Sequence, residues 1–446
     1  MAPHDATVEP RLSLWLRVRR YAVPPSMIKA ATARRRAGDW AGACAAAGVD
    51  TDLRPRLVAR AHGRDLADQL RADLRHLAPD LLRWHLPRIA PDGLLRPGLT
   101  ATLARYDGEG PGGERPLLLI VRTPPAWAGA GQRISLALWD PRRPAECAGL
   151  HPHPRPRRRF RLDLHRHLWD ARRAGELRAR SGADRPPGGG HGGLALDRWA
   201  AEAAILLRAE GRSAGPVAVR AGRHRLLLHP DGEGGARVTP APRDLRALPV
   251  LPDAATWTLP DLELLRAGAI GPGLLHPLVA EALLPDGAPP GAFPAHGPAA
   301  GEARLVNCRG AEHRIGLSGG VLTALDHDPE EIRREELLAA LGGPPLPCLW
   351  AVDEAHRRPE SLDGVRERLG HGDVAGALAL VEDLLGPAAA LREGPLREAL
   401  ETAAHRRVAY GVYRTGLTGP VRPGPPPFHA RPRTDYRTHP RHASRR

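Results

Sequence analysis

The amino-acid sequence predicts an α+β protein in which helical hairpins at both ends flank antiparallel β modules, with Pro/Gly-rich linkers between them. Two observations predict this class. A capping pattern occurs near both ends of the chain, as Gly38–Ala43 (GDWAGA) and as Gly372–Ala377 (GDVAGA). Between the copies, from about residue 99, the apolar residues change from helical spacing to the alternation of strands. A chain of 446 residues is long enough for several domains.

The capping pattern predicts a turn between two antiparallel helices. Gly38 and Gly372 can adopt the left-handed conformation that ends a helix, and Asp39 and Asp373 can accept hydrogen bonds from the free N–H groups of the next helix. The small residues that follow let this helix pack closely against its partner. Both turns resemble the inter-helix turn of tetratricopeptide-type repeats over about twenty residues each, and the resemblance implies hairpins that bind other proteins.

Residues 26–104 are expected to be mainly helical, because Leu66, Leu70, Leu74 and Leu77 recur at helical spacing. After them, alternating apolar runs separated by Gly and Pro predict an antiparallel meander, two helices and three further strands. The expected strands are 99–106, 116–123, 133–139, 217–220, 223–229 and 236–239, and the expected helices are 163–180 and 196–210.

The C-terminal part begins after a segment, 285–301, that is almost all Pro, Gly and Ala and therefore predicts a linker. The sequence after this linker predicts three short strands, a helix with Pro in its first turn, the second capping turn and a long final helix. The expected strands are 304–308, 314–317 and 321–325, and the expected helices are 329–341 and 391–410.

These elements divide the chain into six segments. The tail has little apolar surface to bury, so we expect it to be disordered. The segments are an N-terminal helical domain (1–98), a central α+β domain (99–284), a linker (285–301), a β-hairpin-plus-helix module (302–345), a C-terminal helical hairpin domain (346–418) and a disordered basic tail (419–446).

The formal net charge of +15 is concentrated in residues 11–36, 150–180 and 419–446, which are rich in arginine. Arginine keeps its charge and binds carboxylates and phosphates through a planar, bidentate head group. This distribution suits docking onto an acidic protein surface or, as an alternative, contact with nucleic-acid phosphates. Aromatic residues make up only 4% of the chain, so base stacking is disfavoured. The candidate partner-binding residues are Arg34, Arg35, Arg36, Trp40, Arg157, Arg158, Arg159 and Arg161.

The cysteines and the apolar runs indicate the compartment. The four cysteines are widely spaced and form no CxxC pair, as expected for reduced, buried side chains. The longest apolar strand-like run, Leu117–Val121, is far shorter than the about twenty residues needed to span a membrane. We therefore expect a cytoplasmic protein without a membrane partner.

The string Asp353–His356 (DEAH) resembles the metal- and water-handling box of DEAH-type helicases. Those enzymes also need a glycine-rich loop that ends in Lys-Ser or Lys-Thr and holds the phosphates. Lys29 is the only lysine, and it follows Ser26-Met27-Ile28 instead of such a loop. We therefore expect no ATP hydrolysis of the phosphate-loop type, and interpret residues 350–358 as the start of a helix whose acids face water.

Gly316–Gly320 (GLSGG) matches the nucleophile-elbow pattern of hydrolases, and the possible partners of Ser318 downstream are Asp326, His327, Asp353 and His356. That chemistry requires a strand, a strained turn and then a long helix. Here the segment after the turn is itself strand-like, so a hairpin turn is the simpler interpretation. A hydrolase with a site near Ser318, Asp326 and His327 stays as an alternative function.

Cys308 and His313, with four residues between them, could supply two metal ligands, and His327 or Cys348 could complete a tetrahedral site. Structural zinc sites usually show two close ligand pairs, and only one is visible, so a buried cysteine beside a surface histidine is the preferred interpretation. We assign no catalytic, cofactor or metal residue from the sequence. The function expected is a non-catalytic intracellular scaffold or adaptor that binds a protein partner through its hairpins and Arg-rich surfaces.

Overall fold

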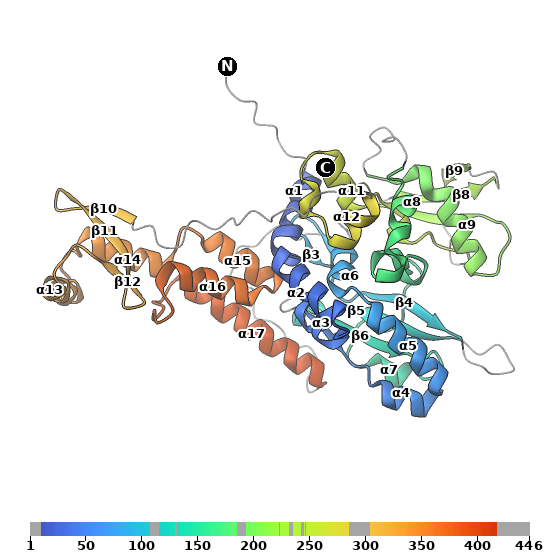
Figure 1. The fold of residues 1–446 in the computed structure, drawn as a ribbon, viewed down its shortest axis with the longest axis horizontal. Helices are drawn as coiled ribbons and strands as arrows, with labels where there is room; N and C mark the ends of the chain where they lie inside the picture. The colour runs from blue at the N-terminus through green and yellow to red at the C-terminus, as the bar shows by residue number, and fades with distance from the viewer. Residues whose placement is uncertain are drawn as a thin grey trace, which may run out of the picture. The chain divides into compact units, whose positions relative to one another are not determined.

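The computed structural model describes residues 10–107, 116–129, 132–184, 193–222, 224–231, 235–241, 245, 247–284 and 304–416. The chain divides into two compact units, one of residues 1–293 with 412–446 and one of residues 294–411. Helices and small, largely antiparallel sheets alternate along both units, which confirms the α+β class (Figure 1). The predicted linker 285–301 and the predicted tail 419–446 lie outside the described residues.

The main sheet of the first unit has the strand order β1-β6-β5-β4. β4, β5 and β6 form the predicted antiparallel meander, at Thr100–Tyr106, Leu117–Arg122 and Ile134–Trp139. β1, Val49–Thr51, is not predicted from the sequence and pairs parallel to β6. A strand of three residues has no alternating pattern of its own and forms only because β6 offers its edge.

Helices from the N-terminal region and from residues 253–283 pack with this sheet in one hydrophobic core, which contains Trp15, Leu70, Leu103, Leu119 and Leu264. Residues on both sides of position 98 therefore contribute to the same core. The helices are α1 Pro10–Arg17, η1 Val18–Ala22, α2 Pro25–Arg36, α3 Trp40–Ala46, α4 Pro55–His62, α5 Arg64–His76, α6 Pro79–His85, α10 Asp253–Thr256, α11 Pro260–Arg266, η8 Pro272–Leu274 and α12 Pro277–Leu283. A short hairpin, β2 Arg88–Ile89 with β3 Leu94–Leu95, follows α6, while η2 Ala126–Ala128 and α7 Pro144–Ala148 flank β6.

The helix predicted over 163–180 is wrong in form. The chain instead makes three 3₁₀ turns, η4 Leu162–Leu164, η5 Arg166–Leu168 and η6 Ala171–Glu176, and one short helix, α8 Leu177–Ser181. The Asp170 side chain accepts a hydrogen bond from the backbone N–H of Arg172, and the Asp170 backbone forms an isolated β-bridge with Leu77, the residue after α5. This local hydrogen bond and this tertiary bridge replace the i,i+4 bonds of a continuous helix.

A second sheet in this unit joins β7 Val217–Ala221, β8 His224–Pro230 and β9 Ala236–Pro240 in antiparallel order, as predicted. The predicted helix 196–210 forms as η7 Leu196–Arg198 and α9 Trp199–Ala209. Its buried face, which includes Trp199 and Leu206, packs against the sheet in a separate core.

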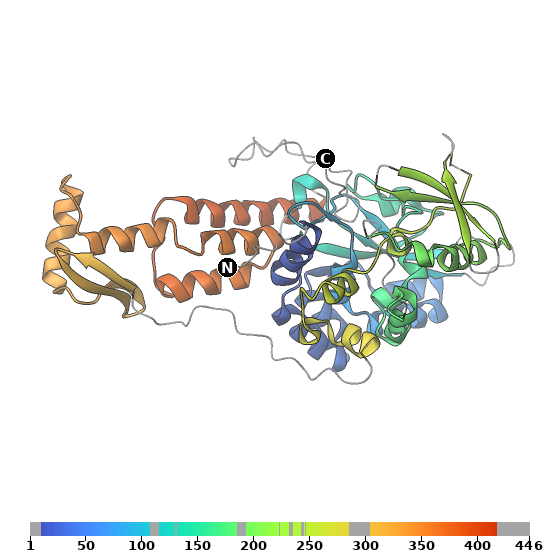
Figure 2. The ribbon, with the colours of Figure 1, turned by 90° about the horizontal axis from the view of Figure 1, so that it is seen from above.

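The second unit starts with a three-stranded antiparallel sheet and continues as helices. α15, α16 and α17 lie side by side in both views (Figures 1 and 2) and share a core that includes Val365, Val381 and Leu396. The elements are β10 Arg304–Cys308, β11 Ala311–Ser318, β12 Val321–Ala324, α13 Pro329–Ala340, α14 Pro347–Arg357, α15 Leu362–His371, α16 Val374–Leu385 and α17 Pro395–Thr415.

Both predicted capping turns form. Gly38 and Gly372 have φ angles of 77° and 88°, and each turn joins two helices, α2 to α3 and α15 to α16. Asp39 accepts a hydrogen bond of 2.8 Å from the N–H of Gly42. Asp373 accepts the equivalent bond of 3.0 Å from the N–H of Gly376. The local chemistry of the repeated pattern therefore determines both turns.

In the structure, the last glycine of each pattern, Gly42 or Gly376, leaves room for an ion pair at the cap. The expected role was close helix packing. An arginine five residues before the cap binds the capping carboxylate, with Arg368 Nη1 2.7 Å from Asp373 Oδ2. A Cβ at position 376 would clash with the Asp373 carboxylate and lie 2.8 Å from Arg368 Nη1. The first copy repeats this arrangement with Arg34, Asp39 and Gly42. Glycine is needed because the capping ion pair occupies the space of a side chain.

This arrangement predicts that Gly376→Ala fails to stabilise the second unit, although Gly→Ala within a helix normally adds about 1 kcal/mol to the free energy of unfolding. The new Cβ would open a cap that is worth about 1 kcal/mol. Gly411→Ala in α17 is the matched control, because a Cβ there meets no atom within 4 Å. Urea unfolding of the two variants should differ by about 1–2 kcal/mol. Equal stabilisation by both substitutions would show that the cap does not depend on Gly376.

Candidate metal centre and basic patch

Three metal-ligating side chains meet in the second unit. The Sγ atoms of Cys308 and Cys348 and one ring nitrogen of His327 lie within 4.8 Å of one another. Both cysteines are completely buried, and His327 is 9% exposed. Burial and the adjacent Cys308 thiol raise the pKa of Cys348 to about 11. Two thiols and an imidazole match the donor types that bind Zn²⁺ in proteins.

Three separate elements position these ligands. Cys308 ends β10, His327 lies between β12 and α13, and Cys348 is the second residue of α14. β10 turns sharply into β11 at Arg309 and Gly310, which have φ angles of 59° and 84° and so form the left-handed pair of a two-residue hairpin. The turn keeps Cys308 at the end of the sheet, next to the start of α14.

The His327 ring is oriented by a carboxylate. Its Nδ1 lies 3.3 Å from Oε2 of Glu331, one turn further along the chain on α13. Arg309 binds the other oxygen of the same carboxylate at 3.0 Å. The buried Nε2 of His327 has no hydrogen-bond partner among the described residues. This pattern favours the tautomer with the proton on Nδ1, which leaves the Nε2 lone pair available.

His313 lies directly beside this group. Its ring stacks on the ring of His327, with centroids 4.3 Å apart and planes 27° apart. His313 pairs with Val306 across β10 and β11, so it lies on the same face of the sheet as Cys308. Its Nδ1 is buried and has no hydrogen-bond partner among the described residues. The four residues considered as ligands from the sequence are therefore brought together.

Ser318 lies in a different environment from a nucleophile elbow. It pairs with Val321 at the end of a hairpin whose turn is Gly319 and Gly320, and a strand follows the turn. Asp326 binds Arg314 at 2.7 Å, and this ion pair lowers the pKa of Asp326 to about 2. The hairpin interpretation of this segment is confirmed, and the geometry gives no support to the hydrolase alternative.

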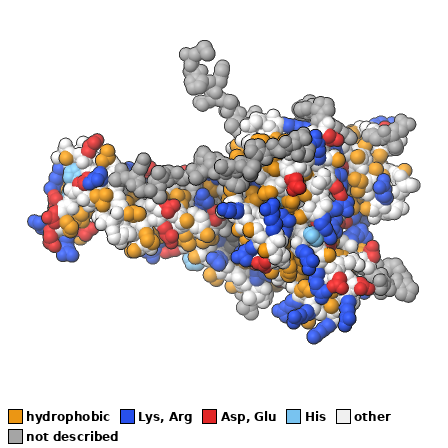
Figure 3. All heavy atoms as spheres, in the orientation of Figure 1, with side chains coloured by type: hydrophobic (Ala, Val, Ile, Leu, Met, Phe, Trp, Pro, Cys, Tyr) orange, Lys and Arg blue, Asp and Glu red, His pale blue; other side chains and the backbone are white. Residues whose placement is uncertain are grey.

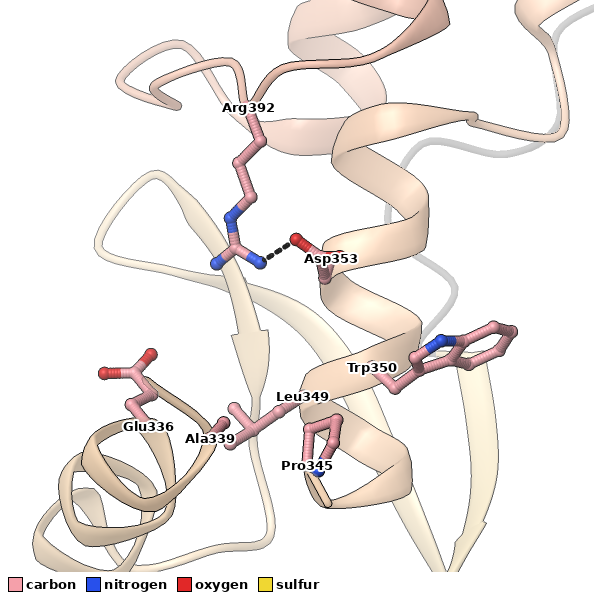
Figure 4. Close-up of a pocket in the computed structure, with 7 residues that line it drawn as sticks. All are labelled: Glu336, Ala339, Pro345, Leu349, Trp350, Asp353 and Arg392. Carbon is pink, nitrogen blue, oxygen red and sulfur yellow. Dashed lines mark hydrogen bonds and ion pairs between the residues drawn. The ribbon is translucent and has the colours of Figure 1, made fainter. Parts of the chain in front are cut away.

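Asp353 belongs to α14 and not to a strand. Its carboxylate binds Arg392 at 2.5 Å and Arg357 at 2.8 Å. Figure 4 shows this ion pair beside a pocket of about 360 Å³, in which Leu349 points toward Ala339. The lining residues are Glu336, Ala339, Pro345, Leu349, Trp350, Asp353 and Arg392. The Asp353 carboxylate is engaged by two arginines instead of facing water freely.

The candidate partner-binding residues fall into two groups, and many of them bind acids of the same chain. Arg34 pairs with the capping Asp39, and Arg161 binds Asp163 at 2.7 Å. In the first group, Arg34 and Arg36 are exposed and Arg35 is partly buried, while Trp40 packs against the main core. In the second group, Arg158 is exposed, whereas Arg157, Arg159 and Arg161 are partly buried.

Arg157 and Arg159 belong to a basic patch, which we define as Arg157, Arg159, Arg220 and Arg225. Arg220 and Arg225 are exposed and lie directly opposite each other in β7 and β8. Partial burial and the charges of Arg159, Arg225 and Arg157 lower the pKa of Arg220, opposed by Asp253. Partial burial and the charge of Arg159 also lower the pKa of Arg157. Asp253 already binds Arg159 at 2.5 Å.

Arg220 and Arg225 are not predicted from the sequence, since a cross-strand pair depends on the register of two strands. A second group of arginines lies elsewhere in the first unit: on the face drawn in Figure 3, basic side chains gather around α4, where Arg54, Arg56 and Arg60 are exposed.

Comparison with protein-family models, with curated proteins and with solved structures gives no match. In the part of the chain that the structure describes, no helix combines the length and the apolar character needed to cross a membrane.

Proposed function

We propose that this chain is a non-catalytic adaptor that docks the acidic surface of a protein partner onto the basic patch. The observation that carries the proposal is the like-charge pair Arg220 and Arg225, with Arg157 and Arg159 alongside. Like charges directly opposite each other in a sheet destabilise it. A partner carboxylate that binds between them would remove this repulsion, so the patch is suited to an anionic ligand.

The nature of the patch favours a protein surface over nucleic acid. Phe160, the aromatic ring beside the patch, is 4% exposed, and Arg159 and Arg96 lie 5.6 and 6.0 Å from its centroid. A buried ring between guanidinium groups cannot stack on a base. The patch can therefore offer a ligand only charge-assisted hydrogen bonds from its guanidinium groups, which carboxylates accept in a bidentate manner.

The test compares a fluorescent poly-glutamate peptide with a single-stranded DNA of equal charge, both titrated with the full chain at low salt. We expect Arg157→Gln/Arg220→Gln to weaken peptide binding about tenfold, and the difference to vanish as salt rises. Arg56→Gln/Arg60→Gln on α4 is the control, because it removes the same charge elsewhere in the first unit.

Two results would contradict the proposal. Peptide binding that is unchanged by the Arg157/Arg220 substitutions, or reduced equally by the α4 control, would show that the patch is not the docking site. Tighter binding of the DNA than of the peptide, abolished by the patch substitutions, would assign the patch to nucleic-acid phosphates instead.

A further inference from the structure

We infer that Cys308, Cys348, His327 and His313 bind one Zn²⁺ in a closed structural site that stabilises the sheet and helices α13 and α14. The inference is independent of the proposed docking function. It rests on the geometry of the four side chains, on their unpartnered nitrogens and on the small core of this part of the unit.

The spacing of the donors fits a tetrahedral ion. Bond lengths of about 2.3 Å to sulfur and about 2.0 Å to nitrogen require donors about 3.3–3.8 Å apart. The three central donors lie within 4.8 Å of one another, so small side-chain shifts bring them to these distances. His313, whose ring stacks on that of His327, lies outside this group of three, and its ring must rotate to supply the fourth donor. Thiolate donors select Zn²⁺ over Mg²⁺ or Ca²⁺, which prefer oxygen.

The residues around the four ligands have the features expected around a protein zinc site. Glu331 holds Nδ1 of His327 as carboxylates hold zinc-binding histidines, and Arg309 holds Glu331 in turn. Cys348 lies in the first turn of α14, an eleven-residue helix whose positive N-terminal end favours a thiolate. Binding requires both thiols to lose their protons to solvent, so that two thiolates and two neutral imidazoles surround the ion.

The packing shows why this part of the unit needs such an ion. It has two small core clusters, whose buried members among the described residues are Cys308, Ala324, Leu346 and Cys348 in one and Ile315, Ala351 and Val352 in the other. α13, a helix of twelve residues, has no buried residue. A module with so little apolar burial usually requires a disulfide or a metal for stability. The ion would join β10, the loop before α13 and the start of α14.

The first test uses the unaltered full chain, purified with reductant, and measures zinc by mass spectrometry. We expect one zinc per chain and a Co²⁺-substituted form with the spectrum of a tetrahedral, thiolate-bound ion. Alkylation followed by peptide mapping should show Cys308 and Cys348 protected until a chelator is added, whereas Cys147 reacts equally in both states. Less than a tenth of an equivalent after incubation with Zn²⁺, or a Co²⁺ spectrum without a thiolate band, would overturn the site.

The second test uses variants in competition with a zinc indicator. We expect Cys308→Ser, Cys348→Ser and His327→Ala to lower the affinity by more than about a hundredfold, and Glu331→Gln by about tenfold. Cys147→Ser and His224→Ala are the controls and should bind as the natural chain does. Unchanged affinity in His313→Ala would overturn the four-ligand form of the site. If a ligand variant fails to fold, protection of the unaltered chain against alkylation still decides the question.

Discussion

Replacing Asp261 with alanine is expected to lower the free energy of unfolding of the first unit by about 3–5 kcal/mol. Asp261 is completely buried on α11. Its carboxylate accepts hydrogen bonds of 2.9 Å from Arg19 Nη2 and 2.7 Å from Trp84 Nε1. Arg19 is itself 5% exposed and lies over the Trp84 ring at 3.8 Å. Without Asp261, the Arg19 charge would stay buried without its direct partner.

The electrostatics of this pair agree with that expectation. Burial opposes the charged carboxylate, but the neighbouring His85 ring and the Arg19 charge hold the pKa of Asp261 below its ordinary value. Burial lowers the pKa of Arg19, against the charges of Asp261 and Asp80. Each group therefore needs the other in order to remain ionised inside the core.

A double substitution distinguishes the effect of losing a charge partner from the effect of losing packing volume. Arg19→Met/Asp261→Leu should be more stable than Asp261→Ala alone, because it removes both buried charges together. Asp68→Ala serves as the control, since the exposed Asp68–Arg71 pair is expected to contribute less than about 1 kcal/mol. Urea unfolding followed by tryptophan fluorescence gives the free energies. An Asp261→Ala variant as stable as the Asp68→Ala control would refute the expectation.

The features that the sequence predicted are those that local chemistry determines. The caps at Asp39 and Asp373 depend on residues within five positions, and both form as expected. The β10–β12 hairpins also follow from turn glycines and short alternating runs. By contrast, the Arg19–Asp261 pair joins residues 242 positions apart. The sequence of an amphipathic helix does not show whether the carboxylate of an acidic residue contacts water or a distant arginine.

The candidate sites also combine residues that the sequence predicts with residues that only the fold brings together. Arg157 and Arg159 could be proposed from charge density, but Arg220 and Arg225 become part of the patch only through the register of β7 and β8. The four ligands of the proposed zinc site were visible as residue types. Their spacing along the chain lacks a second close pair because one ligand comes from a loop and another from the start of α14. Only the fold brings them together.

The first unit is expected to lose stability as the pH falls from about 6.5 to about 4, because two histidines are held neutral in the folded state. Burial lowers the pKa of His151 to about 4. Nδ1 of His151 accepts a hydrogen bond of 3.1 Å from the N–H of His153, and its Nε2 lies 3.0 Å from the carbonyl oxygen of Thr123. A proton on Nδ1 would break the first bond, and the nearby Arg122 charge also disfavours it.

His167 is the second of these histidines. Burial, followed by the charges of His165 and Arg180, lowers its pKa well below the ordinary value, against the charge of Glu202. Glu202 itself binds His165 at 3.1 Å and Arg198 at 2.6 Å. Burial would raise the pKa of Glu202, but the hydrogen bonds from His165 and Arg180 hold it far below the ordinary range.

The sign of the effect is the same for all three groups. Below about pH 6.5 the unfolded chain protonates His151 and His167 while the folded chain does not, so each histidine removes about 1.4 kcal/mol of stability per pH unit in this range. Below about pH 4.5 the unfolded chain also protonates Glu202, and stability falls further. Above pH 7 these groups contribute no pH dependence.

Urea unfolding at pH 7.5, 6.0 and 5.0 measures this loss. His151→Gln should reduce the slope of the free energy of unfolding against pH by about 1.4 kcal/mol per pH unit. Glutamine keeps a donor and an acceptor but does not titrate. His224→Gln changes an exposed histidine of β8 and should leave the slope as it is. A stability that stays constant or rises between pH 7.5 and 5.0 would mean that His151 and His167 are charged or accessible in the folded protein. In that case the hydrogen bonds of His151 and the burial of His167 would not contribute to the stability of the first unit as described.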